Sequence, residues 1–455
     1  MTVAYEMPGN PRQADLGLPP WRLVAIAKEE KMKKTLFTLL CLVLLTSLAW
    51  AEEQPYEYPI VNRYEATVIG TPDFRRPELP DRIRVEPLEM TVFRDRKTPD
   101  VFWYWDTFRC SLAYQKGRAP LIFIVAGTGA SYNSANMILL QKVFYKAGFH
   151  VINLSSPTSA DFIVGASTTQ IPGNIMDDTR DLYRVMQLAW NQVKDRIEVS
   201  EFYLTGYSLG AAQSAFLAKL DDDRHLFNFK KVLLINPPVS LYNSASILDD
   251  MLAENIPGGP DHLDEFFDQL MQKVSRVYKR MGSIDLSGNF LYDIYKFESI
   301  DKEDMEALIG LSFRISSGNM IFTSDVVTNT GYIKPKNLIL TTGDSTTDYF
   351  KVCSHTSFLD YFNQMFYPFF LARHPDLTKQ ALIDILSLKS IEGYLKNTKK
   401  IGLVHNEDDI ILAPGEIDFF RQVFGSRAKF YPNGGHCGNM IYIENVDYMI
   451  EFFKN

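Results

Sequence analysis

The sequence predicts an α/β fold in which helices cover both faces of a mostly parallel sheet and a large helical segment interrupts the alternation. Short apolar runs such as residues 121–125 are typical of strands buried on both faces of a parallel sheet. Strands and helices are expected to alternate up to about residue 242 and again from residue 399, as in a sheet covered by helices. Between these stretches, residues 244–397 are mostly helical in pattern and dense in Phe, Tyr, Met and Leu.

The expected elements follow one another in chain order. Residues that favour β-structure predict two early strands, over residues 83–93 and 101–114. The next elements are a strand over 119–125, a helix over 136–148, a strand over 149–156, a helix over 174–197, a strand that ends at 206–210, a helix over 211–220 and a strand over 230–242. After the helical segment come a strand, loop and helix within 399–424, a strand and loop within 428–442, and a last helix. The helix over 174–197 is amphipathic, with apolar residues near helical spacing at Met176, Leu182, Val185, Met186 and Ala189.

Composition narrows the class of protein. Of the 455 residues, 46% are hydrophobic and 22% charged, which are ordinary values for a globular protein. The net charge of −8 argues against nucleic acid as a partner. No Cys-x-x-Cys or His-Glu-x-x-His occurs, so no metal site is predicted. The loop at 127–132 is partly similar to a dinucleotide-binding loop, but Tyr132 replaces its third glycine, so no cofactor is predicted.

The N-terminal region carries the pattern of an export signal. Lys33 and Lys34 precede an apolar stretch at residues 36–45, and Ala49-Trp50-Ala51 fits the small-x-small cleavage pattern. We therefore expect a signal peptide over 32–51, a mature protein that is periplasmic or secreted, and no membrane span after cleavage. The alternative is an uncleaved anchor or a lipoprotein.

Residues 1–31 are mixed in character and partly acidic, so they are expected to be a mis-assigned upstream extension; the alternative is a long n-region. Cys41 lies in the middle of the apolar stretch with no small residue before it, which argues against lipidation. The other cysteines are Cys110, Cys353 and Cys437. They allow one bridge and one free thiol, and the sequence leaves their pairing open.

A Gly-x-Ser-x-Gly motif at residues 206–210 stands where a strand gives way to a helix. This context is typical of a nucleophile elbow, which presents a serine on a sharp, strained turn. Gly206 and Gly210 would avoid collisions with the adjoining strand and helix, and Ala211 and Ala212 suit close packing. Ser208 is therefore predicted to be a nucleophile. The alternative is a glycine-rich turn with a solvated serine.

A serine nucleophile needs a base, and the sequence indicates His436. This histidine follows Gly434 and Gly435 in a loop after a late strand. His150 and His405 fall in apolar strands and are expected in the core or at an edge of the sheet. The remaining four, outside the expected sheet, are His225, His262, His355 and His374.

The base in turn needs an acid to orient it. Glu407, Asp408 and Asp409 follow a strand, and sites in α/β proteins lie at the carboxyl ends of strands. Asp409 is the predicted acid and Asp408 the reserve. At least two of the three acids are expected to belong only to a solvated turn.

These residues give the sequence a resemblance to the α/β-hydrolase superfamily. The resemblance covers roughly residues 83–242 and 399–455, and its motifs lie at 206–210, 406–409 and 434–438. The order Ser208, Asp409, His436 is the order of that superfamily's catalytic triad. Asn406 stands where the family often has glycine, and asparagine tolerates the left-handed backbone such a position requires.

The resemblance also implies an oxyanion hole and a lid. The Leu209 amide and the Thr128 amide would donate to the oxyanion, with Gly127 or Gly129 as alternatives to Thr128. The family usually has His-Gly where this chain has Ala126-Gly127. A lid would correspond to residues 244–397.

The sequence therefore predicts a core in two parts, residues 52–243 and 398–455, with a helical cap at 244–397. The expected function is that of an exported serine hydrolase acting on a small-molecule or acyl-ester substrate, and the ester is inferred by analogy with the superfamily. A serine peptidase and an acyltransferase use the same chemistry. A non-catalytic binding protein that uses the cap is the alternative from another class, and the oligomeric state is left open.

Overall fold

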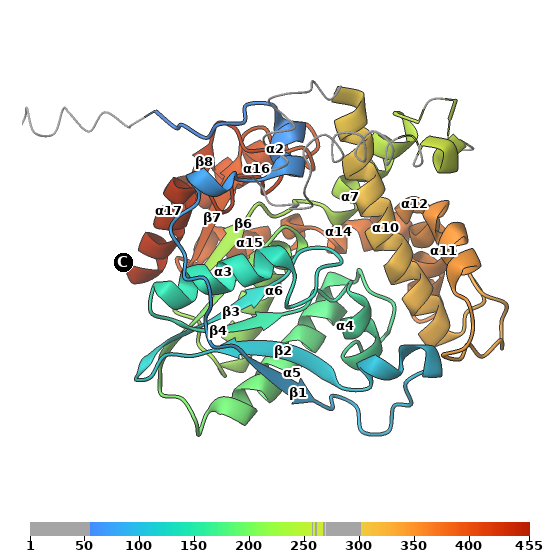
Figure 1. The fold of residues 1–455 in the computed structure, drawn as a ribbon, viewed down its shortest axis with the longest axis horizontal. Coiled ribbons are helices and arrows are strands. Elements are labelled where there is room, and N and C mark those ends of the chain that lie inside the picture. Colours follow the sequence, from blue (N-terminus) through green and yellow to red (C-terminus); the bar gives the residue numbers. More distant parts are fainter. Residues whose placement is uncertain (1–54, 257, 260–261, 267–268, 270–301) are drawn as a thin grey trace, which may run out of the picture. The chain divides into compact units, whose positions relative to one another are not determined.

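An eight-stranded sheet forms the centre of the computed structural model (Figure 1). The structure describes residues 55–256, 258–259, 262–266, 269 and 302–455, so the predicted segments 1–31 and 32–51 lie outside the described residues. Residues 1–57 and 58–455 form separate units, and the sheet belongs to the second. The strands are β1 (Glu86–Met90), β2 (Phe108–Ala113), β3 (Ala119–Val125), β4 (His150–Leu154), β5 (Val199–Tyr207), β6 (Lys231–Ile235), β7 (Ile401–Asn406) and β8 (Ala428–Tyr431).

The strand order is β1-β2-β4-β3-β5-β6-β7-β8. β2 runs antiparallel to both of its neighbours, and every pair from β4 to β8 is parallel. This order and these directions define the α/β-hydrolase fold, so the predicted fold class is confirmed. The carboxyl ends of β5, β6 and β7 therefore lie next to one another, where active sites form in parallel sheets.

Helices cover both faces of the sheet. One face packs against α3 (Ala135–Lys146) and α17 (Ile443–Lys454), whose Phe144 and Phe453 rings lie 5.6 Å apart. The other face packs against α5 (Ile175–Val193), α6 (Leu209–Arg224) and α16 (Glu416–Phe424). Each central strand alternates its side chains between the two layers, and both sets are buried.

The insertion, residues 244–397, is helical and contains no named strand in its described part. The longest helix of its described part, α10 (Lys302–Thr328), runs beside α7 (Leu241–Ala253) and α11 (Thr347–Ser354) and also contacts α4 (Ala160–Gly165) (Figure 1). The other elements in the described part of the insertion are α12 (Phe358–Tyr361), a π-helical turn (Phe362–Phe366), α13 (Tyr367–Leu371), α14 (Lys379–Ile385), a 3-10 turn (Leu388–Ile391) and α15 (Glu392–Asn397).

The chain before β1 forms α2 (Arg63–Ile69) and a 3-10 turn (Asp73–Arg75). A second 3-10 turn (Asp100–Trp105) lies between β1 and β2. The Asn62 side chain caps α2 by accepting from the amides of Tyr64 and Glu65. Within the described residues, no helix is both long and apolar enough to cross a membrane.

Several local predictions are wrong. The strand expected over 230–242 ends at Ile235, and helix α7 begins at Leu241. The strand expected over 101–114 is shorter, because Pro99 starts a 3-10 turn and only Phe108–Ala113 joins the sheet. Within that turn, Phe102 is buried against Phe322 of the insertion, with ring centroids 6.1 Å apart, while Trp103 is 62% exposed. In α5, Met176 is 37% exposed rather than on the buried face, because the helical spacing turns it away from Leu182 and Met186, while its neighbour Ile175 is buried.

Candidate active site

Ser208 occupies a strained turn between β5 and α6. Its backbone has φ 54° and ψ −127°, a combination that side chains rarely adopt. The Ser208 amide donates to the Ile235 carbonyl of the neighbouring strand at 2.9 Å, which holds the turn in place. The structure thus gives this serine the conformation of a nucleophile elbow, with Oγ presented at the carboxyl edge of the sheet.

The two motif glycines make this turn possible. A Cβ atom added to Gly206 would lie 2.4 Å from the Gly210 carbonyl oxygen. One added to Gly210 would lie 2.3 Å from the Val125 carbonyl oxygen and 2.5 Å from that of Ala126. The obstructing atoms are backbone atoms, so they cannot rotate away. Any side chain at either position would collide with backbone. Glycine at both positions therefore allows the turn to pack this closely between β3 and α6.

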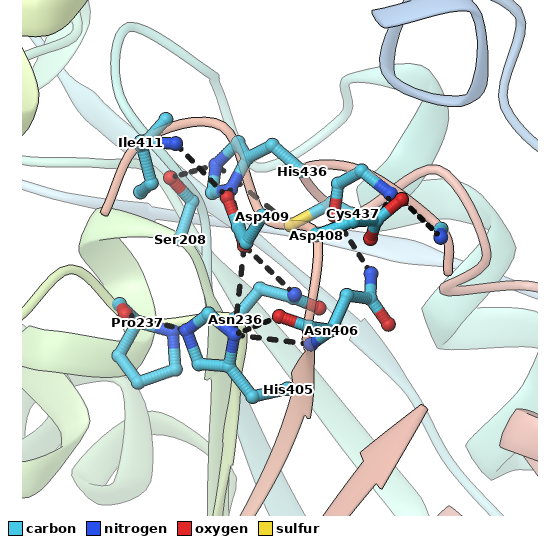
Figure 2. A network of polar contacts seen from close by, with 12 residues as sticks. Ser208, Asn236, Pro237, His405, Asn406, Asp408, Asp409, Ile411, His436 and Cys437 are labelled. Atoms are coloured by element: carbon cyan, nitrogen blue, oxygen red, sulfur yellow. Dashed lines mark hydrogen bonds and ion pairs between the residues drawn. The ribbon is translucent and has the colours of Figure 1, made fainter. Parts of the chain in front are cut away.

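Ser208, His436 and Asp409 form one chain of contacts (Figure 2). Nε2 of His436 lies 2.9 Å from the Ser208 Oγ. Nδ1 of His436 lies 3.1 Å from each carboxylate oxygen of Asp409. The three predicted residues, which are more than 200 positions apart at their extremes, are thus brought together in the geometry that a serine, a base and an orienting acid require.

Asp409 is buried, and polar groups satisfy both of its oxygens. Nδ2 of Asn236 donates to Oδ2 at 2.9 Å, and the Ile411 amide donates to Oδ1 at 3.2 Å. Burial alone would raise the pKa of Asp409, but the charge and hydrogen bond of His436 outweigh burial. The pKa of Asp409 therefore lies below its ordinary value, and the group is a carboxylate at neutral pH.

The pKa of His436 moves in the opposite direction. Burial opposes its charged form, but the neighbouring Cys437 sulfur and the Asp409 carboxylate outweigh burial and raise the pKa well above the ordinary value of histidine. The direction follows from the two 3.1 Å contacts with Asp409. The site therefore stabilises the imidazolium that forms when His436 accepts a proton.

The neighbouring acids have other partners. Asp408 accepts from the amides of Gly434 and Gly435 at 3.2 and 2.9 Å, so it shapes the loop that carries His436. Glu407 forms an ion pair with Arg421 at the surface. Of the three candidates, Asp409 contacts the His436 ring, and the reserve acid Asp408 supports the loop backbone instead.

The two residues whose amides are expected to form an oxyanion hole line the same pocket as Ser208. Thr128 and Leu209 both line the pocket over Ser208. Leu209 is the first residue of α6, whose N-terminal amides and dipole favour negative charge. The Gly129 amide already donates to the Thr158 hydroxyl at 2.8 Å, so Gly129 does not serve as the second donor.

A pocket of about 820 Å³, its open mouth included, lies over Ser208. The core contributes the catalytic edge of this pocket, and the insertion contributes Phe313, Met320, Phe358 and Tyr361. No Asp, Glu, Lys or Arg is among the described residues that line it. The pocket is therefore a largely apolar chamber that Ser208 and His436 border, while Asp409 lies outside its lining.

Three hydroxyl groups in the pocket wall donate to backbone carbonyls. Tyr361 donates to the Pro172 carbonyl at 2.8 Å, Ser244 to the Ile411 carbonyl at 2.7 Å and Ser317 to the Phe313 carbonyl at 2.9 Å. These groups are occupied within the protein, so they present little polarity to a bound molecule.

Two residues near the site have roles that the sequence did not reveal. Asn236 follows β6 with φ 47°, and its side-chain amide donates to Asp409. In the sequence, its position directly after a strand was the only indication of this role. Asn406 was expected to supply a left-handed turn, but it ends β7 as a buried residue. Its side chain donates to the Gly435 carbonyl at 2.8 Å and to the Asn439 side chain at 2.9 Å.

The remaining histidines and cysteines considered in the sequence analysis lie outside the catalytic contacts. His150 and His405 are fully buried in strands, and Nε2 of His405 lies 3.0 Å from the Pro237 carbonyl oxygen. Burial lowers the pKa of His405, which keeps it neutral beside the site. Cys110, Cys353 and Cys437 are free thiols. Among the described residues, no cluster of His, Cys, Asp and Glu could hold a metal ion.

No protein-family model and no curated protein matches the sequence. Solved structures that resemble the chain include a putative hydrolase from Legionella pneumophila, at 11% identity and a TM-score of 0.41, covering 87% of this chain and 96% of that one. Esterase B from Lactobacillus Rhamnosis matches at 12% identity and a TM-score of 0.39, covering 94% and 95%. Est1E from Butyrivibrio proteoclasticus matches at 11% identity and a TM-score of 0.34, covering 77% and 96%. At such identities and scores, function has to be argued from the site itself.

Proposed function

We propose that the chain is a serine hydrolase that cleaves carboxylic esters through an acyl-enzyme on Ser208. The observation that carries the proposal is the position of His436, with Nε2 2.9 Å from the Ser208 Oγ and Nδ1 3.1 Å from the buried Asp409 carboxylate. A serine hydroxyl is a weak nucleophile until a base takes its proton, and this arrangement supplies that base.

The reaction has two halves. Ser208 Oγ attacks the acyl carbonyl carbon while His436 takes the hydroxyl proton, and the Leu209 and Thr128 amides stabilise the oxyanion. The bond to the leaving alcohol then breaks, and His436 gives its proton to that alcohol. In the second half, His436 takes a proton from water as the water oxygen attacks the acyl carbonyl carbon. The bond between that carbon and the Ser208 Oγ then breaks, His436 returns the proton to Oγ, and the carboxylic acid leaves.

The pocket supports an uncharged, apolar acyl group as the substrate. A charged acyl group would lose its hydration among Phe313, Met320 and Phe358 without an ionic partner in the wall. An aliphatic or aromatic group would instead bury apolar surface, at about 25 cal/mol per Å². The leaving group is assigned only as an alcohol.

Export belongs to the same proposal and is supported by the signal pattern at residues 32–51. Mass spectrometry of the mature protein tests it. A chain that begins at Glu52 is expected, and a chain that retains residues 32–51 would refute cleavage.

The test of the function is hydrolysis of p-nitrophenyl esters from short to long acyl chains, with Ser208→Ala measured in parallel. We expect turnover that falls by about 10⁶-fold in Ser208→Ala, because the nucleophile is lost while the fold is kept. Circular dichroism of both proteins controls for folding. No turnover of any ester by the folded wild-type protein would refute the proposal and favour a peptidase, an acyltransferase or a binding protein.

A further inference from the structure

The loop that carries His436 is held by a segment from the other end of the sequence. This segment, residues 58–71, is called the N-terminal strap here, and its central element is α2. The His436 amide donates to Oγ1 of Thr67 at 2.8 Å. The same hydroxyl donates to the Arg63 carbonyl at 2.7 Å, so α2 fixes its orientation as an acceptor for His436.

Further contacts tie the strap to the loop on both sides of His436. Nδ2 of Asn433 donates to the Ile60 carbonyl at 2.9 Å. Oγ1 of Thr71 donates to the Gly438 carbonyl at 2.9 Å, and both groups are buried. The loop is therefore bonded to the strap before, at and after the histidine.

The strap and the loop are also in direct backbone contact. A Cβ atom on Gly435 would lie 2.1 Å from the Arg63 carbonyl oxygen and 2.4 Å from Oγ1 of Thr67. A Cβ atom on Gly438 would lie 2.0 Å from the Ala66 carbonyl oxygen. The glycines that flank His436 thus make room for the strap, and any movement of α2 would move the loop.

On its other side the strap packs against the insertion and the acid turn. Tyr64 is buried in one apolar cluster with Met305 and Ile309 of α10 and with Ile410 and Ile411. Ile411 in turn donates its amide to Asp409. The strap therefore contacts the loop of the base, the turn of the acid and a helix of the pocket wall.

We propose that Thr67 is a positioning residue that holds His436 between Ser208 and Asp409. The hydrogen bond to the His436 amide fixes the backbone from which the side chain extends. The imidazole ring is therefore held within hydrogen-bonding distance of both Ser208 and Asp409. This inference rests on the proposed function for its consequence in catalysis. It concerns a residue 369 positions from His436 that does not line the substrate pocket.

The experiment compares Thr67→Val, which keeps the shape but loses the hydroxyl, with Thr67→Ser, which keeps the hydroxyl. Thr71→Val is the matched control, because the same substitution in the same strap removes the bond to Gly438 and leaves the one to His436. For each variant, kcat, KM, thermal stability and the pH dependence of kcat/KM are measured. The pKa of the His436 imidazole is followed by NMR with ¹⁵N-labelled histidine.

We expect Thr67→Val to lower kcat by about 10- to 100-fold with KM unchanged, because small displacements of a catalytic group are costly and the pocket is intact. The neutral form of His436 is the base, so activity rises with pH through its pKa. As the ring moves from Asp409, this rise should shift to lower pH, and the NMR titration should shift with it. Thr67→Ser should restore both, and Thr71→Val should lose stability but keep the pH profile.

A wild-type kcat and pH profile in Thr67→Val would overturn the inference. Equal losses of kcat in Thr67→Val and Thr71→Val with unchanged pH profiles would also overturn it, because the strap would then act through stability alone. If the wild-type protein cleaves no ester, the proposed function fails but the NMR titration still decides. A His436 pKa that is the same with and without the Thr67 hydroxyl refutes positioning.

Discussion

The carboxyl edge of the sheet and the helical insertion enclose the same pocket but are fixed in different ways. At the sheet edge, backbone meets backbone. The Gly210 position leaves no room for a Cβ atom against β3, and the Gly435 position leaves none against α2. Such contacts have no freedom to adjust, so Ser208 and His436 are held by the main chain itself.

In the insertion, α7 and α10 also approach through their backbones, since a Cβ atom on Gly310 would lie 2.5 Å from the Leu252 amide nitrogen, but buried polar side chains link the helices as well. Arg314 of α10 and Asp249 of α7 form a buried ion pair at 3.1 Å, and Asp249 also accepts from the Leu359 amide of α12. At the end of α10, the Asp325 carboxylate accepts from the amides of residues 331–334. Helices joined in this way can change their apolar side chains without moving the backbone that carries the catalytic groups. The sheet edge therefore positions the catalytic groups, and the insertion provides the side chains that would select the acyl group.

Among the variants that compare the two regions, the acid at the sheet edge should show the largest effect. Asp409→Asn should lower kcat by about 10⁴-fold, because an amide neither stabilises the imidazolium nor fixes its tautomer. Loss of the carboxylate also lowers the pKa of His436, so the remaining activity should begin its rise at lower pH. The measurement is the pH dependence of kcat for p-nitrophenyl ester hydrolysis.

Asp408→Asn is the neighbouring control. Asp408 binds the amides of Gly434 and Gly435 rather than the imidazole. Its substitution should cost about 1–3 kcal/mol of stability and far less activity than Asp409→Asn. Equal losses of kcat in the two variants would show that the turn acts as a whole and that the structure assigns the wrong acid.

The sequence was informative at the sheet edge because the signals there are local. The elbow follows from glycines within two positions of Ser208, and Asp409 and His436 follow from loops after strands. The strands themselves follow from apolar runs such as residues 121–125. The physical demand on each of these residues comes from its immediate neighbours in the chain.

Other features arise only from tertiary contacts and could not be predicted. Thr67 lies in a short helix 369 positions from His436, and nothing near it in the sequence indicates a partner. Asn236 acquires its role because β6 and β7 are adjacent in the sheet. The residues of 101–105 favour β-structure, but Pro99 and the packing of Phe102 on the insertion prevail.

The next expected effect tests the insertion. Arg314→Met should lower the free energy of unfolding by about 3–5 kcal/mol, because Asp249 would remain buried without its partner. Since Phe313 and Ser317 flank Arg314 on α10 and line the pocket, KM for long-chain esters should rise while kcat for short-chain esters is kept. Urea denaturation and steady-state kinetics provide the two measurements.

The double variant Arg314→Met with Asp249→Leu is the control, because replacing both charges with apolar groups removes the desolvation penalty. It should recover most of the stability that Arg314→Met loses. If Arg314→Met alone is as stable as the wild-type protein, the ion pair does not hold α7 to α10. The difference proposed between the sheet edge and the insertion would then lose its main support.

The smallest expected effect compares one glycine from each region. Gly210→Ala should destabilise the protein by about 1–3 kcal/mol, because its Cβ would meet two backbone carbonyl oxygens that cannot rotate away. Gly393→Ala, in α15 of the insertion, places its Cβ where no atom lies within 4 Å and should stabilise by up to about 1 kcal/mol. Urea denaturation measures both. Opposite signs are expected because backbone atoms close the Gly210 position while the Gly393 position is open. A Gly210→Ala protein as stable as the wild type would show that the elbow has room to relax.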